Sequence, residues 1–401
     1  MLKKAFIPFK GYYSSPFSRW QGTLQYENAI VLGATTAKRW LESKGWDPTQ
    51  YEYVVFGNTI GQHHQFYASS WAAAMMGAPH VSAVIISQAC TTSTTCIWTA
   101  ALGVEMGMYG MAAALMTDRC SNGPHTVWPN PLGPGAEVIS ENWLMDNFNA
   151  DPNVGLRMIE TAENVAKLGG FTKELADELS LHRYNQYLMA LENDREFQKR
   201  YMFPVEIRMS KKKTVTVEAD EGIMPSTAEG LAKLKPVVPG GILSFGAQTH
   251  PADGNCLVTV CTEEKARELS EDPSIPVQII SYGFSREKAG YMAAAPVPAA
   301  NMALERAGLK ITDIKAIKTH NPFIANDLYM AKQLGIEPKG TQDMSFNNYG
   351  SSLVYGHPQG PTAGRNIIEG IEEVAMKGGG YLLWAGCAAG DTGGALIIKV
   401  G

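Results

Sequence analysis

Residues Val81–Val104, VSAVIISQACTTSTTCIWTAALGV, decide how the chain is built. The start of this stretch, 81–86, is rich in β-branched apolar residues and predicts a strand, whereas Cys96–Val104 is apolar on most of its faces and predicts a buried helix. Cys90 falls at the turn between them. Free backbone N–H groups and the helix dipole favour a thiolate there, although a lone cysteine of this kind is more often buried and inert.

Length and composition indicate a globular enzyme. At 401 residues the chain exceeds one small core, so two or three domains or one duplicated architecture are expected. An apolar fraction of 45% is ordinary, and a net charge of −5 gives no reason to expect nucleic-acid binding. The lysine run at 211–213 is interpreted as a solvated loop or as a contact for an anionic ligand.

Cysteine usage and the first residues bear on the compartment. The six cysteines contain no CxxC pair, which favours a reducing cytoplasm over a disulfide framework. The start, MLKKAFIPFKGYYSSPF, has no apolar run of signal-peptide length, and no stretch approaches the length that spans a membrane. We therefore expect a cytoplasmic protein without membrane association.

Strand-like and helix-like segments alternate in both halves of the chain. Strands are expected at 5–7, 53–56, 112–116, 257–261, 277–282, 314–318, 381–385 and 395–400, and helices at 27–44, 65–76, 155–167, 172–193, 296–307, 324–334 and 360–375. This alternation predicts a largely parallel sheet covered on both faces. We infer two sheets, one from each half, interrupted by an inserted lobe that begins after Thr117 and contains a loop at 128–135.

Three further positions carry chemistry. Gly356-His357-Pro358 holds a histidine in a loop, where it can exchange protons near neutral pH or merely cap a turn. Cys387 ends an apolar strand and enters a glycine-rich loop, whose backbone N–H groups suit an oxyanion but which also fits a tight hairpin turn. His320 donates a hydrogen bond or only ends its strand. A nucleophilic thiol, a base and a second acid are what thioester acyl transfer with carbon–carbon cleavage requires.

The whole chain resembles the thiolase family in a set of ordered motifs. They are Ser15-Pro16-Phe17, Phe56-Gly57-Asn58, Gln88-Ala89-Cys90, Thr161-Ala162-Glu163-Asn164-Val165-Ala166, Asp220-Glu221-Gly222-Ile223, Leu231-Ala232-Lys233-Leu234-Lys235-Pro236, Gly356-His357-Pro358 and Cys387. The resemblance implies an α/β fold of five layers, α-β-α-β-α, made from two similar halves. Residues 1–117 and 246–275 would form the N-terminal half, 118–245 an inserted loop domain that binds coenzyme A, and 276–401 the C-terminal half.

The resemblance also assigns roles to the residues singled out above. Cys90 is similar to the acylated nucleophile, His357 to the base that activates it, and Cys387 to the acid and base that acts on the carbon of the acyl-CoA. His320 and His357 would hold the enolate oxygen, and the backbone N–H groups of Cys90 and Ala389 the tetrahedral oxyanion. A decarboxylating ketoacyl synthase, which also uses one cysteine and two histidines, is the nearest rival, and Cys387 favours the thiolase.

Coenzyme A and acyl-CoA are the partners that the resemblance implies. Coenzyme A would lie against the inserted domain and near Ala247, Gln248 and Thr249, as a substrate; no permanently bound cofactor and no metal is expected. Thiolases generally pair through their core sheets, so a homodimer or a dimer of dimers is expected. A non-catalytic acyl-CoA-binding subunit of a complex is the alternative from another functional class.

Several motifs depart from the common family pattern. Where most thiolases have Asn-Glu-Ala-Phe, this chain has His320-Asn321-Pro322-Phe323, which is similar to the sterol-carrier-protein type. Residues 387–391 replace the family motif Cys-x-Gly-Gly-Gly, and residues 252–256 replace Asn-Asp-Gly-Ala-Ala. Met224 occupies the position of an expected basic residue. These departures resemble an outlying branch, which includes thiolases that work with a small zinc-ribbon and OB-fold partner subunit and 2-benzoylsuccinyl-CoA thiolase in aromatic degradation.

Four aromatic residues raise the question of an aromatic substrate. They are Trp71, Tyr349, Tyr355 and Trp384. Large aromatic side chains most often belong to a hydrophobic core, and we expect these four to do so, with an aryl-binding pocket as the alternative.

Overall fold

The computed structural model describes residues 1–210 and 212–401. Lys211, part of the lysine run, therefore lies outside the described residues. Its neighbour Lys213 is exposed and begins β10 (Lys213–Val217), the partner of β9 (Val205–Ser210).

A two-residue strand, β1 (Phe6–Ile7), joins two half-sheets into one sheet of twelve strands. In chain order the strands of the N-terminal half are β2 (Tyr12–Ser14), β3 (Ser18–Arg19), β4 (Tyr53–Gly57), β5 (Ser82–Ile86), β6 (Met111–Arg119) and β11 (Ala252–Cys261). Those of the C-terminal half are β12 (Val277–Arg286), β13 (Ile314–His320), β14 (Ser345–Phe346), β15 (Gly380–Ala388) and β16 (Thr392–Val400).

The two half-sheets have the same strand arrangement on either side of the seam. The order is β14-β13-β15-β16-β12 on one side of β1 and β11-β6-β4-β5 on the other. Pairing is parallel in β4–β5, β4–β6, β13–β14 and β13–β15, and antiparallel in β6–β11, β12–β16 and β15–β16. The expectation of a largely parallel sheet is therefore wrong, because long antiparallel strands flank β1. The expectation of two separate sheets is also wrong, because β1 pairs with a strand of each half.

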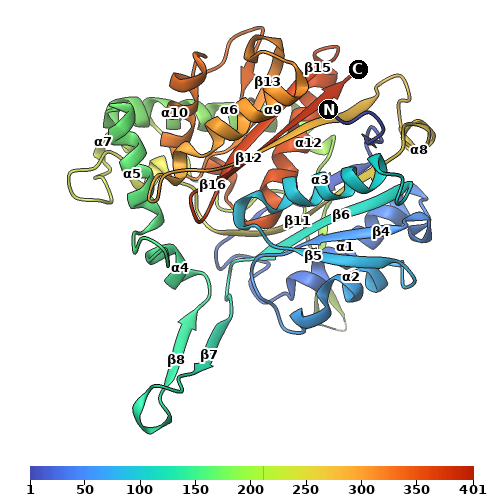
Figure 1. Ribbon diagram of the computed structural model, residues 1–401, viewed down its shortest axis with the longest axis horizontal. Coiled ribbons are helices and arrows are strands. Elements are labelled where there is room, and N and C mark those ends of the chain that lie inside the picture. Colours follow the sequence, from blue (N-terminus) through green and yellow to red (C-terminus); the bar gives the residue numbers. More distant parts are fainter. Residues whose placement is uncertain (211) are drawn as a thin grey trace.

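Helices make the other three layers of an α-β-α-β-α arrangement (Figure 1). The outer helices of the N-terminal half are α1 (Ala29–Lys44) and α2 (Ala68–Met76), and those of the C-terminal half are α9 (Pro296–Ala307) and α10 (Ile324–Leu334). Between the half-sheets lie α3 (Thr92–Glu105) and α12 (Gly360–Met376), which contact each other and the strands on either side. The stretch from 81 to 104 thus supplies an edge strand and one of the two central helices, as predicted.

The central helix α12 is buried but carries charged side chains, and each is paired. The Arg365 guanidinium contacts Asp220 at 2.6 Å and Glu369 at 3.0 Å, and the side chains of all three are fully buried. Because a buried charge without a partner is strongly destabilising, these pairs fix where α12 lies. Asp220 belongs to the segment inserted between the halves, so the pair also ties that segment to α12.

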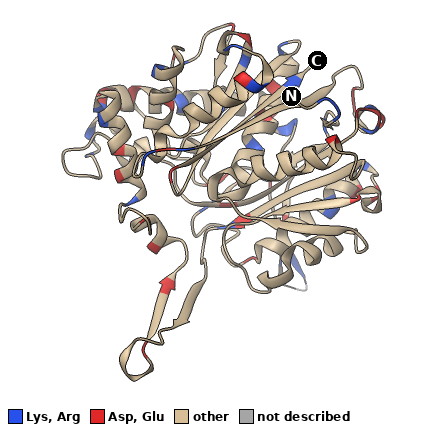
Figure 2. Cartoon of the chain, in the orientation of Figure 1, with Lys and Arg blue, Asp and Glu red and all other residues tan. Residues whose placement is uncertain are grey.

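The inserted segment contains two hairpins and several helices. Its hairpins are β9–β10 and β7–β8 (His125–Pro129 and Val138–Asn142), and its helices are α4 (Met145–Asn149), α5 (Met158–Gly169), α6 (Lys173–Lys199) and α7 (Ala228–Lys233). The predicted loop at 128–135 is confirmed from Asn130 onward, where the turn of β7–β8 lies, whereas Trp128 and Pro129 belong to β7. This hairpin projects from the body and carries no lysine or arginine (Figure 2). The short helices α8 (Glu263–Leu269) and α11 (Ser352–Tyr355) complete the fold.

No helix in the described part of the chain combines the length and the apolar character needed to cross a membrane. All six cysteines are free and buried.

Candidate active site

Cys90 lies in a single 3-10 turn, Ala89–Thr91, that leads from β5 into α3. Ala89 has a left-handed backbone with φ of 43°, and its carbonyl accepts a hydrogen bond from the Thr92 hydroxyl at 2.7 Å. This turn places the thiol at the N-terminal end of a buried helix. The Cys90 side chain is nearly buried, with 8% of the residue exposed.

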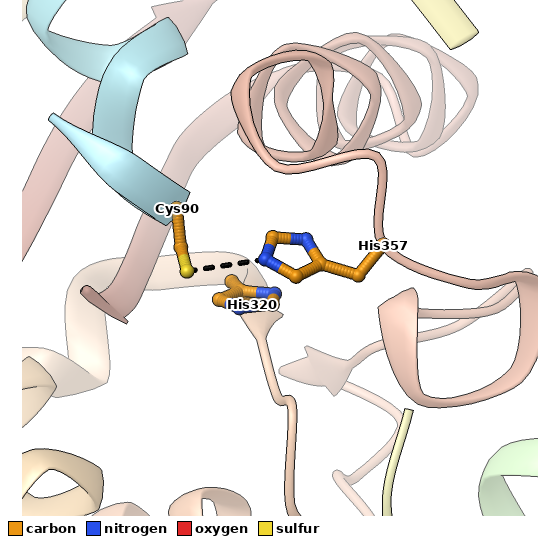
Figure 3. A group of neighbouring side chains, drawn as sticks. All are labelled: Cys90, His320 and His357. Atoms are coloured by element: carbon orange, nitrogen blue, oxygen red, sulfur yellow. Dashed lines mark hydrogen bonds between the residues drawn. The ribbon is translucent and has the colours of Figure 1, made fainter. Parts of the chain in front are cut away.

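His357 reaches Cys90 from the loop between α11 and α12. Its Nε2 atom lies 3.1 Å from Cys90 Sγ (Figure 3). Its Nδ1 atom lies 2.6 Å from the Thr362 hydroxyl. With Nδ1 donating to Thr362, Nε2 is left to accept a proton from the thiol. Residues 267 positions apart in the sequence thus form a thiol–imidazole pair.

Burial determines the charge of this pair. It raises the pKa of the Cys90 thiol to about 12, although hydrogen bonds from the backbone N–H groups of Ala389 and of Cys90 itself act in the opposite direction. Burial also lowers the pKa of His357 to about 3. In the ligand-free site the thiol and the imidazole are therefore both neutral near pH 7, because burial outweighs the effect of the helix N-terminus. Proton transfer must accompany attack by the sulfur.

His320 and Cys387 lie at the ends of neighbouring parallel strands. In the β13–β15 pairing His320 is opposite Gly386, one residue before Cys387. The ring of His320 stacks on that of His357 with centroids 4.0 Å apart (Figure 3). The Nδ1 atom of His320 lies 2.9 Å from the Ser352 hydroxyl. Among the described residues nothing pairs with its Nε2. Burial lowers the pKa of His320 and raises that of Cys387, and the nearby Cys90 raises the pKa of Cys387 further.

A buried polar network supports the His320 strand end. The Asp327 carboxylate accepts hydrogen bonds from Thr319, Asn321, Asn347 and Arg183 at 2.7 to 3.1 Å. Arg183 comes from α6 of the inserted segment, and its side chain and that of Asp327 are fully buried. A fully partnered network of this kind is rigid, so it fixes the strand end that carries His320.

An apolar cavity of about 510 Å³ opens onto the thiol. Cys90, His357 and Ala389 line it, as do Gln248 and Thr249 from the predicted coenzyme A site. The other lining residues include Met145, Phe148, Met158, Tyr184, Met224, His250, Met292, Phe323, Leu353 and Gln359. Ala247 is fully buried behind this surface, and His320 and Cys387 also lie beneath it with no exposed area.

The four aromatic residues discussed above pack in the core, as expected. Trp384 and Tyr355 are fully buried, Tyr349 stacks on Phe197 with centroids 3.7 Å apart, and Trp71 packs against the outer N-terminal cluster. Different aromatic side chains line the cavity.

The described chain contains one cluster of side chains whose ligand atoms could hold a metal ion, namely Cys90, His320 and His357. Their ligand atoms lie within 4.8 Å of one another. One sulfur and two imidazole nitrogens would leave an open fourth position on zinc.

Asn326 is a residue that sequence reasoning missed. It lies in the first turn of α10, is 2% exposed, and its Nδ2 donates hydrogen bonds to Cys387 Sγ and to the Ala293 carbonyl, both at 3.3 Å. A donor aimed at sulfur stabilises the thiolate. The sequence gives no local signal for this contact, because Asn326 and Cys387 are 61 residues apart.

Under the role that the resemblance implies for Cys387, replacing Asn326 by alanine is expected to slow proton exchange at C2 of an acyl-CoA about tenfold near pH 8, because the Cys387 pKa rises by about one unit without the amide donor. Exchange in D2O followed by NMR measures this step, and the pH midpoint of the rate should rise by the same amount. Asn301→Ala, the same change at an exposed site on α9, is the control. An unchanged midpoint in a folded Asn326→Ala variant contradicts the role.

Sequence comparisons match the chain to two family models. The model described as "Thiolase, N-terminal domain" matches residues 11–264, and "Thiolase, C-terminal domain" matches residues 274–400. An acetyl-CoA acetyltransferase of Syntrophomonas wolfei is 28% identical, with 96% of each chain covered. The mitochondrial 3-ketoacyl-CoA thiolase of Homo sapiens is 26% identical, again with 96% of each chain covered.

Solved structures share the fold over the whole chain. An acetyl-CoA acetyltransferase of Bacillus anthracis superposes with a TM-score of 0.90 at 24% identity, covering 100% of this chain and 99% of that one. The human mitochondrial 3-ketoacyl-CoA thiolase superposes with a TM-score of 0.89 at 25% identity, with the same coverage. A further structure of that human enzyme was solved in complex with CoA.

Proposed function

Because the chain belongs to the thiolase family and is a thiolase-type acyltransferase acting on 3-ketoacyl-CoA, we propose that Cys90 carries the acyl group during turnover. The contact that carries this proposal is the 3.1 Å approach of His357 Nε2 to Cys90 Sγ at the base of an apolar cavity. A cysteine with an adjacent base is the arrangement that nucleophilic catalysis requires.

In the first step the Cys90 sulfur attacks the 3-oxo carbon while its proton moves to His357 Nε2. The oxyanion that forms accepts hydrogen bonds from the backbone N–H groups of Cys90 and Ala389, which already lie close enough to Cys90 Sγ to affect its pKa. The bond between C2 and C3 then breaks, and its electron pair passes to the enolate of the departing acyl-CoA.

In the second step the Cys387 thiol gives its proton to C2 of this enolate. The enolate oxygen is held by His320 and His357, whose stacked rings lie beside Cys90. Free coenzyme A then gives its thiol proton to the Cys387 thiolate and attacks the acyl group on Cys90. The Cys90 sulfur leaves and regains its proton from His357. The Cys387 proton remains on C2 of the released acyl-CoA, and the proton of coenzyme A restores the Cys387 thiol, so both thiols of the chain end in their starting state. This scheme requires no metal and no permanently bound cofactor.

We place coenzyme A in the cavity beside Gln248 and Thr249, against the inserted domain at 118–245. Residues from that domain, including Met145, Phe148 and Met158, line one wall of the cavity, and the remaining wall comes from the two halves at 1–117 with 246–275 and at 276–401. An apolar channel suits the pantetheine arm, which has little charge.

We also propose that an aromatic acyl group, such as the benzoyl group of 2-benzoylsuccinyl-CoA, fits this cavity. Phe148, Phe245 and Phe323 line it together with Tyr184. Aromatic rings favour offset or edge-on contact with other rings.

A homodimer or a dimer of dimers is proposed for the assembly. Strand β5 lies at the end of the sheet with Ile85 40% exposed, and an apolar sheet edge favours pairing with another chain. The β7–β8 hairpin adds the exposed side chains of Val127, Trp128 and Ile139, which suits a second contact between copies. Six free cysteines favour the reducing cytoplasm.

Thiolysis by the purified chain tests this function. With coenzyme A, the chain is expected to convert acetoacetyl-CoA into two molecules of acetyl-CoA, and benzoylacetyl-CoA into benzoyl-CoA and acetyl-CoA, with faster turnover of the aromatic substrate. Chromatography separates the products from the substrates. Adding a small zinc-ribbon and OB-fold partner, as in the outlying branch, shows whether a complex is needed. Absence of products with and without the partner contradicts the proposal and favours the non-catalytic subunit.

A further inference from the structure

Gln359 places a polar side chain beside the reacting sulfur of an otherwise apolar cavity. It is 3% exposed, lines the cavity, and its Oε1 lies 3.4 Å from Cys90 Sγ. Its Nε2 is also buried, and no group in the described chain pairs with it. A buried amide N–H without an acceptor is costly unless a ligand supplies one.

The backbone at Gln359 is strained, which argues against a chance placement. Its φ of 53° and ψ of −100° are unfavourable for a residue with a side chain. The conformation is held from both sides, because the next residue, Gly360, donates its backbone N–H to Asp118 Oδ2 at 2.8 Å and the Thr362 N–H donates to the Gln359 carbonyl at 3.3 Å. Asp118 is itself buried and accepts from Asn58 and from backbone N–H groups. The fold thus keeps this amide in the cavity.

Acylation of Cys90 changes what surrounds the amide. The Cys90 proton has moved to His357 once an acyl group is attached, and the acyl group then occupies the cavity that Gln359 lines, where its atoms can come within reach of Nε2. An oxygen one or two bonds beyond the transferred carbonyl can accept from Nε2, whereas a methylene at that place cannot.

Building on the proposed function, we propose that Gln359 determines specificity among aliphatic acyl groups and selects those that carry a hydrogen-bond-accepting oxygen one or two bonds beyond the transferred carbonyl. The chemical class includes ethers, hydroxyls, ketones and carboxylates at that position. Discrimination arises because an alkyl acyl group leaves a buried N–H without an acceptor, which penalises binding more than the loss of one apolar contact does.

A pair of isosteric substrates isolates the oxygen. In 4-methoxy-3-oxobutanoyl-CoA an oxygen replaces one methylene of 3-oxohexanoyl-CoA. A third substrate, 3-oxoadipyl-CoA, carries a carboxylate further from the transferred carbonyl than the methoxy oxygen. We expect kcat/KM of the wild-type chain to favour the methoxy substrate about tenfold. In Gln359→Leu the preference should vanish or reverse. Gln50→Leu, the same change at an exposed site, is the control and should retain the preference.

Intact-mass measurement of the Cys90 adduct, after incubation with an equimolar mixture of the two isosteres, separates the possible failures. Adducts formed without preference overturn the inference alone. An equal fall in kcat/KM for both substrates in Gln359→Leu also overturns it, since that pattern assigns Gln359 to positioning Cys90 or His357. No adduct from either substrate overturns the proposed function, and the inference with it.

Discussion

Replacing Cys90 by alanine is expected to lower kcat for thiolysis by at least about 10⁴-fold, because no other described group can form the acyl intermediate at that place. The Cys90 thiol lies 3.1 Å from His357 Nε2, and alanine leaves the imidazole without a nucleophile to activate. Product formation followed by chromatography measures the loss. Intact-mass measurement with substrate should show an acyl adduct on the wild-type chain and none on the variant.

Cys96→Ala is the matched control for this variant. Cys96 lies on α3, the helix that follows the Cys90 turn, is fully buried and packs in the central core cluster, away from the cavity lining. Its truncation should reduce stability slightly and leave thiolysis near the wild-type level. Substantial thiolysis by Cys90→Ala would refute the mechanism, whatever the control shows.

The second large effect is expected for Cys387→Ser, whose thiolysis should fall by about 10³-fold. A hydroxyl is a far weaker acid than a thiol, so the enolate no longer receives its proton efficiently. The first acylation of Cys90 should persist, because the contact with His357 is untouched. Rapid quenching followed by mass measurement should therefore trap acyl-enzyme in this variant.

The same variant distinguishes a thiolase from a decarboxylating synthase. A synthase generates its carbanion by losing carbon dioxide and needs no second thiol. A thiolase does not decarboxylate its substrate, so we expect no condensation that depends on malonyl-CoA in the wild-type chain. Malonyl-dependent condensation at equal rates in the wild-type chain and in Cys387→Ser would support the synthase.

Much of the fold could be predicted from hydrophobic periodicity, and the limits of that prediction have a physical cause. Most strands and long helices lie within a few residues of their expected places; α9 and α10, for example, match their predicted bounds. Strand direction was not predictable, since periodicity does not record which strands pair across an insertion. The prolines at 129, 131 and 134 indicated a loop. The loop proved to be the turn of a hairpin, because an exposed edge strand tolerates a proline such as Pro129 at its end.

The site shows a similar division. Cys90 and His357 could be singled out from the sequence because each has a reactive side chain next to the start of a helix. Cys90 lies at a strand-to-helix turn, and His357 lies in a loop that leads into a helix. Gln359 and Asn326 have no local signature, since their roles depend on which sulfur the fold brings beside each amide. The expected thiolate was not found because burial, which a sequence does not report, raises the pKa of Cys90.

The seam strand β1 constrains how a nascent chain can reach its final form. Phe6 pairs with both Cys261 and Gln278, so β1 cannot complete its pairing until β11 and β12 have left the ribosome. Pairings this distant in sequence form slowly and leave sheet edges open to aggregation in the meantime. His357 and Cys387 emerge later still, so we expect a truncated or partly synthesised chain to be inert toward thioesters until its last strands have docked.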